Sequence, residues 1–418
     1  MKRLKKVISH PLFFGGVVMV GGSMVINVIN YFYHLIVGRL LGPINYGTLA
    51  SLFSILYIVG IVPTSTSVAI VKFISSCKSH NEISLVYKSI NKLIFVIALI
   101  LAGLLVVSSP FIANFLRIDN IFLVVLIAPI IFFSLTTLVN QATSQGLLRF
   151  SGYILPGFVS SIGKLVFGIL FILLGFSVFG AMGGIVLGAI FAYLISIPSV
   201  NKIANRKIYR YSKIYDLKDF LKYSFPVLIQ SLAFTSIFTL DVILVKHFLS
   251  PYDAGIYAAL STLGKIIFFA SAPVASAMFP IVVKRKVNNK GYVKIFIVSL
   301  IITSAIGVTV TLIYWLFPDL IIRTLYGNDY LSAKSELVFM GIFVLFYSLS
   351  NFLLNFLLSV SKTIVVVIPL VAAIVQPILI YVYHKNISEI IKVSMFTTIV
   401  MFLSISLFLG YNFARRKI

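Results

Sequence analysis

Long apolar segments, joined by short loops whose basic residues gather in every second loop, constrain the fold of this chain more than any other feature. The hydrocarbon core of a bilayer is about 30 Å thick, and roughly 20 helical residues are needed to cross it. Hydrophobic residues make up 60% of the chain, and its mean hydropathy is +1.10. We therefore expect an all-α polytopic membrane protein.

The apolar segments predict twelve transmembrane helices. The loops between them are too short to fold into domains with cores of their own, so any function must be built from the spans. The expected spans cover residues 12–38, 48–71, 91–110, 121–145, 153–174, 178–198, 221–245, 255–283, 294–317, 336–360, 363–383 and 391–412.

The charge distribution predicts the orientation. The chain has 34 Lys and Arg residues against 10 Asp and Glu residues, a formal net charge of +24. In a soluble protein this excess would suggest a nucleic-acid partner. Here the basic residues lie in alternate loops, which favours retention of those loops in the cytoplasm and attraction to anionic membrane lipids, without nucleic acid. We expect a multi-pass protein of the cell (cytoplasmic) membrane with both termini cytoplasmic.

The two halves of the chain resemble each other. A shift of 208 residues aligns six identical residues around a Leu-x-Pro turn that is followed by a glycine; these are Val37, Leu41, Pro43, Gly47, Ala50 and Leu52 with Val245, Leu249, Pro251, Gly255, Ala258 and Leu260. The repeat predicts an N-terminal six-helix lobe (1–200), a basic cytoplasmic linker (201–218) and a C-terminal six-helix lobe (219–418). The lobes would be related by an axis along the membrane normal, with a central cavity between them.

Two segments carry a resemblance to a known family. Residues 241–265 resemble the seventh-to-eighth span region of polysaccharide flippases of the O-antigen and teichoic-acid type, and residues 38–47 resemble the first-to-second span turn of the same family. This family belongs to the multidrug/oligosaccharidyl-lipid/polysaccharide (MOP) exporter superfamily. The resemblance implies two lobes of six helices and alternating access to a central cavity. It also implies translocation of lipid-linked oligosaccharide or polysaccharide repeat units across the cytoplasmic membrane.

The same resemblance implies which partners and cofactors to expect. The substrate would be a polyprenyl-linked glycan, and a glycan polymerase or glycosyltransferases would act beside the transporter. No cofactor is expected apart from a coupling ion, Na⁺ or H⁺.

Ionisable residues inside spans are costly and mark functional sites by default. Asp241 late in span seven and Lys265 inside span eight are expected within about two helical turns of each other in depth. They are candidates for a coupling or gating site and an anion contact, respectively. The alternatives are a structural ion pair, or pairing of Asp241 with Lys246. His34, whose neighbour aligns with Asp241 in the repeat, is a second coupling candidate, or else an interfacial residue bonded to a carbonyl.

Other polar residues are candidates for the substrate cavity. Lys164 in span five and Arg149 at the end of span four would contact the negative charge of a pyrophosphate-linked glycan. For Lys164, the alternatives are snorkelling to the interface and a structural pairing with another residue. Amides would line a route for sugars or form interhelical hydrogen bonds; they are Asn27, Asn30, Gln141, Gln145, Gln230, Asn351 and Asn355. Tyr31, Tyr33, Tyr257 and Tyr314 are expected in interfacial aromatic belts.

Two other functions compete with this interpretation. A multidrug efflux antiporter of the same superfamily is the alternative, but cationic drugs would favour acidic groups, and the spans hold two lysines against one aspartate. An enzyme is disfavoured because the sequence contains no pair of carboxylates at catalytic spacing, no nucleotide-binding motif, no nucleophile motif and no metal-ligand cluster.

Overall fold

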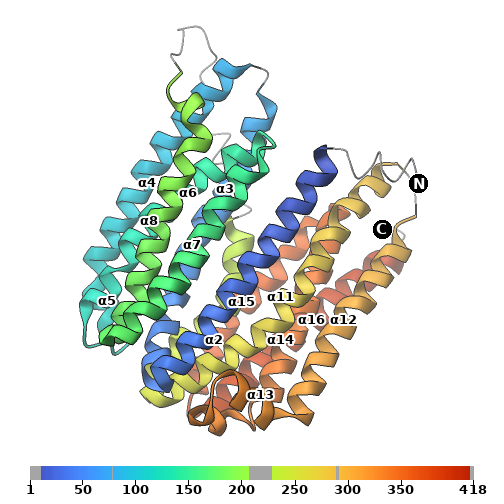
Figure 1. Cartoon of the computed structure of the whole chain (residues 1–418). Coiled ribbons are helices and arrows are strands. Elements are labelled where there is room, and N and C mark those ends of the chain that lie inside the picture. Colours follow the sequence, from blue (N-terminus) through green and yellow to red (C-terminus); the bar gives the residue numbers. More distant parts are fainter. Residues whose placement is uncertain (1–10, 78, 207–227, 289–290, 415–418) are drawn as a thin grey trace. The chain divides into compact units, whose positions relative to one another are not determined.

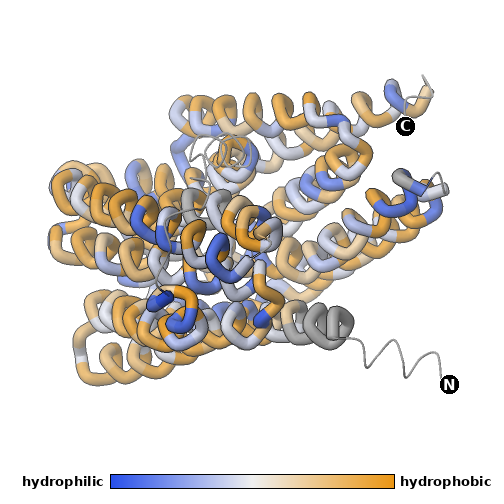
Figure 2. The backbone as a smooth tube through the Cα atoms, turned by 90° about the horizontal axis from the view of Figure 1, so that it is seen from above, coloured by the Kyte–Doolittle hydropathy of each residue, from blue (hydrophilic) through white to orange (hydrophobic). Residues whose placement is uncertain are grey.

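The computed structural model describes residues 11–77, 79–206, 228–288 and 291–414. Every regular element in these ranges is helical. Figure 2 shows hydrophobic residues along most of the length of the helices. The chain is thus an all-α, multi-pass membrane protein, as its hydropathy predicts.

The number of membrane-spanning segments follows from the helices and their breaks. Among the described residues, nine helices are long and apolar enough to cross a membrane, or ten if the bent pair Leu228–Ile237 and Leu240–Phe248 is one span. Two of these helices contain a non-helical residue, Gly42 (φ 67°, ψ 172°) in one and Gly175 (φ 93°, ψ 1°) in the other. Counting the segments on each side of these two breaks separately gives the twelve expected spans.

The contacts between helices divide the chain into two compact units. Unit 1 comprises Met1–Leu41 and Ile55–Ser231, and unit 2 comprises Gly42–Ser54 and Leu232–Ile418. Most of the expected linker 201–218 lies outside the described residues, so the division of the chain into lobes at that linker stays a prediction.

Unit 1 is a bundle in which α7 packs along α8, and α6 packs against α3, α4, α7 and α8 (Figure 1). Its elements are the two ends of α2 (Pro11–Val59) on either side of Gly42–Ser54, α3 (Ile61–Ser76), α4 (His80–Phe115), α5 (Ile121–Val125), α6 (Ile127–Gly146), α7 (Phe150–Phe171), the π-helical turn η1 (Ile172–Phe176) and α8 (Ser177–Ala204).

Unit 2 is a second bundle, in which α14 packs against α11, α12 and α16, and α15 packs against α16 (Figure 1). Its elements are α10 (Leu240–Phe248), α11 (Pro251–Val287), α12 (Val293–Leu316), α13 (Pro318–Leu325), η2 (Asn328–Ala333), α14 (Leu337–Ser359), η3 (Thr363–Val366), α15 (Val367–Val382) and α16 (Ile387–Ala414).

The segment Gly42–Ser54 packs in unit 2 although it lies in the first half of the sequence. Gly42 starts this segment with a backbone conformation that is essentially restricted to glycine. A Cβ atom on Gly47 would lie 2.6 Å from the backbone nitrogen of Gly255, and a Cβ on Gly255 would collide with the carbonyl of Pro43. The two glycines paired by the repeat therefore meet at a close helix crossing.

Candidate functional site

Asp241 lies at a break in span seven. The helices Leu228–Ile237 and Leu240–Phe248 are bent by 44°, and Asp241 occupies the first turn of the second one, α10. Its Oδ1 accepts a hydrogen bond of 2.8 Å from the backbone N–H of Val242. A carboxylate in this position is stabilised by the unpaired N–H groups and the positive end of the helix dipole. The break therefore creates a place for an anion inside an apolar span.

A buried hydrogen-bond network surrounds Asp241. The Tyr257 hydroxyl from α11 donates to Asp241 Oδ2 at 2.6 Å and also shares a hydrogen bond with Ser394 of α16. Gln376 of α15 donates to Ser394 Oγ at 2.9 Å. All four side chains are at most 1% exposed. Gln376 Oε1 has no hydrogen-bond partner in the described part of the chain. Side chains from four helices of unit 2 thus meet in one buried cluster, to which Asp241, Tyr257 and Ser394 contribute oxygen atoms and Gln376 an amide nitrogen.

Lys265 lies beside this cluster and interacts electrostatically with Asp241. Its Nζ lies 4.8 Å from the centroid of the Phe238 ring, which stacks on Tyr347 at 4.7 Å. A cation over an aromatic face is stabilised by the ring quadrupole, more so away from water. The half-buried ammonium of Lys265 is therefore held within the span, where the sequence predicts a contact with an anion.

Lys164 in unit 1 has a similar environment. Its Nζ lies 4.6 Å from the centroid of Tyr33, whose hydroxyl donates to the carbonyl of Ala181 at 3.2 Å. Tyr33 is fully buried, and the ring of His34 contacts its edge with centroids 5.7 Å apart. Tyr33 lies in the first span of its half and Phe238 in the seventh, and the 208-residue shift places them three positions apart. Each half of the chain thus supports one intramembrane lysine with an aromatic ring on the equivalent helix.

Two amide candidates meet in unit 1. Asn27 of α2 and Gln141 of α6 line a pocket of about 320 Å³ together with Ser23, Ser67 and Tyr153. The Gln141 amide donates to the carbonyl of Tyr153 at 2.9 Å, which fixes its orientation. The lining of this pocket therefore combines side-chain amide and hydroxyl groups, both of which form hydrogen bonds.

The other amide candidates lie elsewhere. Asn355 donates to the backbone carbonyl and the side-chain oxygen of Asn351, at 2.8 and 3.2 Å, so these two share one face of α14 as their spacing predicts. Asn30, Gln145 and Gln230 are half-buried. None of these five lines the pocket of Asn27 and Gln141.

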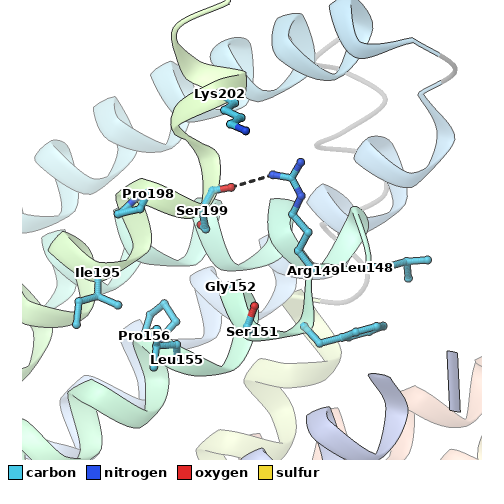
Figure 3. A pocket seen from close by; sticks show the side chains of 11 residues that line it. Leu148, Arg149, Ser151, Gly152, Leu155, Pro156, Ile195, Pro198, Ser199 and Lys202 are labelled. Atoms are coloured by element: carbon cyan, nitrogen blue, oxygen red, sulfur yellow. Dashed lines mark hydrogen bonds between the residues drawn. The ribbon is translucent and has the colours of Figure 1, made fainter. Parts of the chain in front are cut away.

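Arg149 lies at a different place from Lys164. Its guanidinium donates to the backbone carbonyl of Ser199 at 3.1 Å, and it lines a hollow of about 670 Å³ between the start of α7 and the end of α8 (Figure 3). Lys164 does not line this hollow. The two cations expected to act together therefore belong to separate sites in unit 1.

Three tyrosines correct the expectation of interfacial belts. Tyr33, Tyr257 and Tyr314 are at most 2% exposed, and the Tyr314 hydroxyl donates to the carbonyl of Leu263 at 2.7 Å. The belt assignment was wrong because a tyrosine near a span end has the same sequence pattern whether it faces lipid or neighbouring helices. The sequence did contain one signal that Tyr33 is buried, because the 208-residue shift aligns it with Asp241 inside span seven.

The fold resembles solved exporters of the MOP superfamily. A multidrug resistance MATE family transporter in an inward-facing conformation matches with a TM-score of 0.73 and 13% identity, covering 91% of this chain and 95% of that chain. The lipid II flippase MurJ in an inward closed conformation matches with a TM-score of 0.76 and 15% identity, covering 94% of this chain and 87% of that chain. A MOP superfamily transporter from Pyrococcus furiosus matches with a TM-score of 0.62 and 16% identity, covering 95% of each chain. The chain therefore has the fold of these transporters.

The sequence family is more specific. Residues 36–335 match the family described as polysaccharide biosynthesis protein. Because this match covers more than half of the chain, the protein belongs to that family. A comparison with curated protein sequences finds no match.

Proposed function

We propose that this protein is a flippase that moves lipid-linked oligosaccharide or polysaccharide repeat units across the cytoplasmic membrane by alternating access. Membership of the polysaccharide biosynthesis family and the transporter fold support transport of a glycan precursor rather than an enzymatic reaction. The observation that supports an anionic substrate is that the spans hold two lysines, Lys164 and Lys265, each with its ammonium group over an aromatic ring. An anionic diphosphate between lipid and glycan loses its hydration inside the membrane, and fixed cations replace it.

We assign the buried cluster around Asp241 to coupling. Asp241, Tyr257 and Ser394 bring together oxygen atoms, which hard cations such as Na⁺ prefer as ligands, and Asp241 is also able to take up a proton. Binding of either ion would offset the cost of the buried carboxylate and favour one conformation over another. His34 beside Tyr33 remains a proposed second coupling residue.

The pocket of Asn27 and Gln141 is our proposed contact for the sugars of the substrate. We propose the same role for the remaining amides, Asn30, Gln145, Gln230, Asn351 and Asn355. We propose the cytoplasmic membrane as the location, cytoplasmic termini, and glycan polymerases or glycosyltransferases as partners.

Substitution of the two lysines tests this function. In cells that depend on the protein for surface glycan, Lys164→Ala and Lys265→Ala should each strongly reduce surface glycan at normal membrane levels of the protein. Lys286→Ala is the matched control, because Lys286 is also a lysine of a long helix but donates to the backbone carbonyl of Val360 near a helix end. Equal surface glycan in all three variants would exclude an anion pathway through these lysines.

Multidrug efflux is the second candidate, supported by the likeness of fold to a MATE family transporter. This function predicts that the protein confers resistance to cationic drugs. Substitution of Asp241 should abolish that resistance, and substitution of Lys164 should leave it unchanged. Drug susceptibility of the same variants distinguishes the two functions.

A further inference from the structure

The hollow beside Arg149 has features that neither the family nor the proposed substrate cavity explains. It lies where the α6–α7 turn meets the last turns of α8, at the ends of three spans. Two of its eleven lining residues are cationic, Arg149 and Lys202, and none of the eleven is acidic (Figure 3). In Figure 3 the two side chains point toward each other, Lys202 from the end of α8 and Arg149 from the start of α7. Like charges that share one hollow repel each other, and an anion bound between them relieves that repulsion.

The backbone holds Arg149 in place. Leu148 adopts a left-handed conformation (φ 58°), and the N–H groups of Leu148 and Arg149 donate to the carbonyls of Gln145 and Ser144 at 2.9 and 2.8 Å. These bonds form a Schellman motif that ends α6. The hydrogen bond from the guanidinium to Ser199 then anchors the side chain to α8. Arg149 is thus positioned before any ligand arrives.

The first turn of α7 adds further donors. Phe150, Ser151 and Gly152 open this helix and line the hollow. The first N–H groups of a helix have no partners within the helix, and Arg149 at the N-cap position makes no side-chain capping bond. Together with the two cations and the hydroxyl of Ser151, these groups match the acceptor oxygens of a phosphate.

The apolar part of the lining indicates what carries the phosphate. Leu148, Leu155 and Ile195 line the same hollow and are exposed. Leu155 and Ile195 lie further along α7 and α8, toward the middle of the spans, so an apolar chain attached to the phosphate is able to run along them. A soluble anion would make no use of this surface.

We propose that this hollow binds the phosphate group of an anionic lipid, with the lipid chain lying along α7 and α8. Two sources share this chemistry: an anionic glycerophospholipid of the bilayer and a polyprenyl phosphate. The inference does not rest on the proposed flippase activity, because its readout is lipid binding.

Native mass spectrometry of the purified full-length protein tests the proposal. Phosphatidylglycerol or phosphatidylcholine of equal chain length is added to protein in detergent, and the bound lipids are counted. The double variant Arg149→Gln with Lys202→Gln should weaken binding of phosphatidylglycerol about tenfold or more, while binding of phosphatidylcholine stays unchanged. Arg149→Lys should weaken phosphatidylglycerol binding to an intermediate extent, because lysine keeps the positive charge but lacks the planar guanidinium group that donates two parallel hydrogen bonds. Lys286→Gln is the control for loss of one basic charge, and thermal unfolding checks that every variant is folded.

Competition identifies the source of the phosphate. If polyprenyl phosphate displaces phosphatidylglycerol, the site exists and the polyprenyl lipid is one of its occupants. If only phosphatidylglycerol binds, the site exists and its occupant is a lipid of the bilayer. Displacement by inorganic phosphate at the same concentration would overturn the lipid assignment. Undiminished phosphatidylglycerol binding in the folded double variant, or an equal loss in Lys286→Gln, would overturn the site itself.

Discussion

At the scale of single residues, the buried carboxylate of Asp241 is constrained by hydrogen bonds from the backbone of Val242 and the hydroxyl of Tyr257. The sequence predicts its proximity to Lys265, because the cost of charges in hydrocarbon and the helical rise limit where two such groups lie. It does not predict Tyr257 as a partner. That contact depends on α10 packing against α11, and Ser394 of α16, which also hydrogen-bonds to Tyr257, lies far along the chain.

Removal of the Tyr257 hydroxyl should destabilise the protein. Tyr257→Phe leaves a buried carboxylate without one hydrogen bond, which costs about 2 kcal/mol for a bond to a charged group. Tyr314→Phe is the matched control, because its equally buried hydroxyl donates to a neutral carbonyl and should cost about 1 kcal/mol. Chemical unfolding of the purified variants in detergent measures both. A smaller loss for Tyr257→Phe than for Tyr314→Phe would show that Asp241 does not need this bond.

A pair of substitutions separates coupling from structure at Asp241. Asp241→Asn keeps the size of the side chain and removes its charge, so ion-driven transport should be lost in a folded protein. If Asp241 only neutralises Lys265, the double change with Lys265→Met should restore the surface glycan that either single change removes, because no uncompensated buried charge remains. Surface glycan at matched protein levels is the measurement. Full recovery in the double variant would rule out an essential coupling role.

At the scale of elements, many of the span ends were predictable from the sequence, and the contacts between elements were not. The Leu-x-Pro turns and the following glycines mark equivalent helix starts in both halves. Nothing in the pattern indicates that Gly47 and Gly255 touch, or that residues 42–54 pack in unit 2. Similarly, Arg149 and Lys164 both carry the charge expected for a pyrophosphate contact. Only the position of the α6–α7 turn against α8 shows that Arg149 belongs to another site.

The close crossing makes Gly255 intolerant of a side chain. In Gly255→Ala the added methyl group would collide with the backbone of Pro43, which cannot rotate away, so we expect a loss of several kcal/mol of stability or failure to accumulate in the membrane. Gly103→Ala in α4 is the control, because a Cβ there meets nothing within 4 Å and alanine favours the helix. The melting temperatures of the two variants measure the difference. A Gly255→Ala protein as stable as Gly103→Ala would contradict the crossing.

At the scale of the whole molecule, hydropathy alone predicts the number of spans. The orientation in the membrane depends on the distribution of basic residues and remains a prediction. Cysteine labelling in intact cells tests it, using Asn328→Cys and Asp119→Cys in a Cys77→Ser background. Both positions are exposed and lie between spans, whereas the neighbouring Ile118 is buried and unsuitable.

An impermeant thiol reagent should label both positions from outside. Native Cys77 and Asn205→Cys, at the end of α8, should be labelled only after the cells are opened. Labelling of Asn205→Cys in intact cells would show that the orientation is opposite to the predicted one. The lipid site beside Arg149 would then lie on the outer side of the membrane.

The most direct measurement of the central claim is flipping in a defined membrane. The purified protein is reconstituted into liposomes that contain a fluorescent polyprenyl-diphosphate oligosaccharide, and an impermeant quencher reports how much of it becomes accessible, with and without a Na⁺ or H⁺ gradient. We predict protein-dependent, gradient-stimulated movement of this lipid. It should be strongly reduced in Lys164→Ala and Lys265→Ala and retained in Lys286→Ala. Movement of a cationic dye by the same liposomes, with no movement of the anionic lipid, would contradict the account.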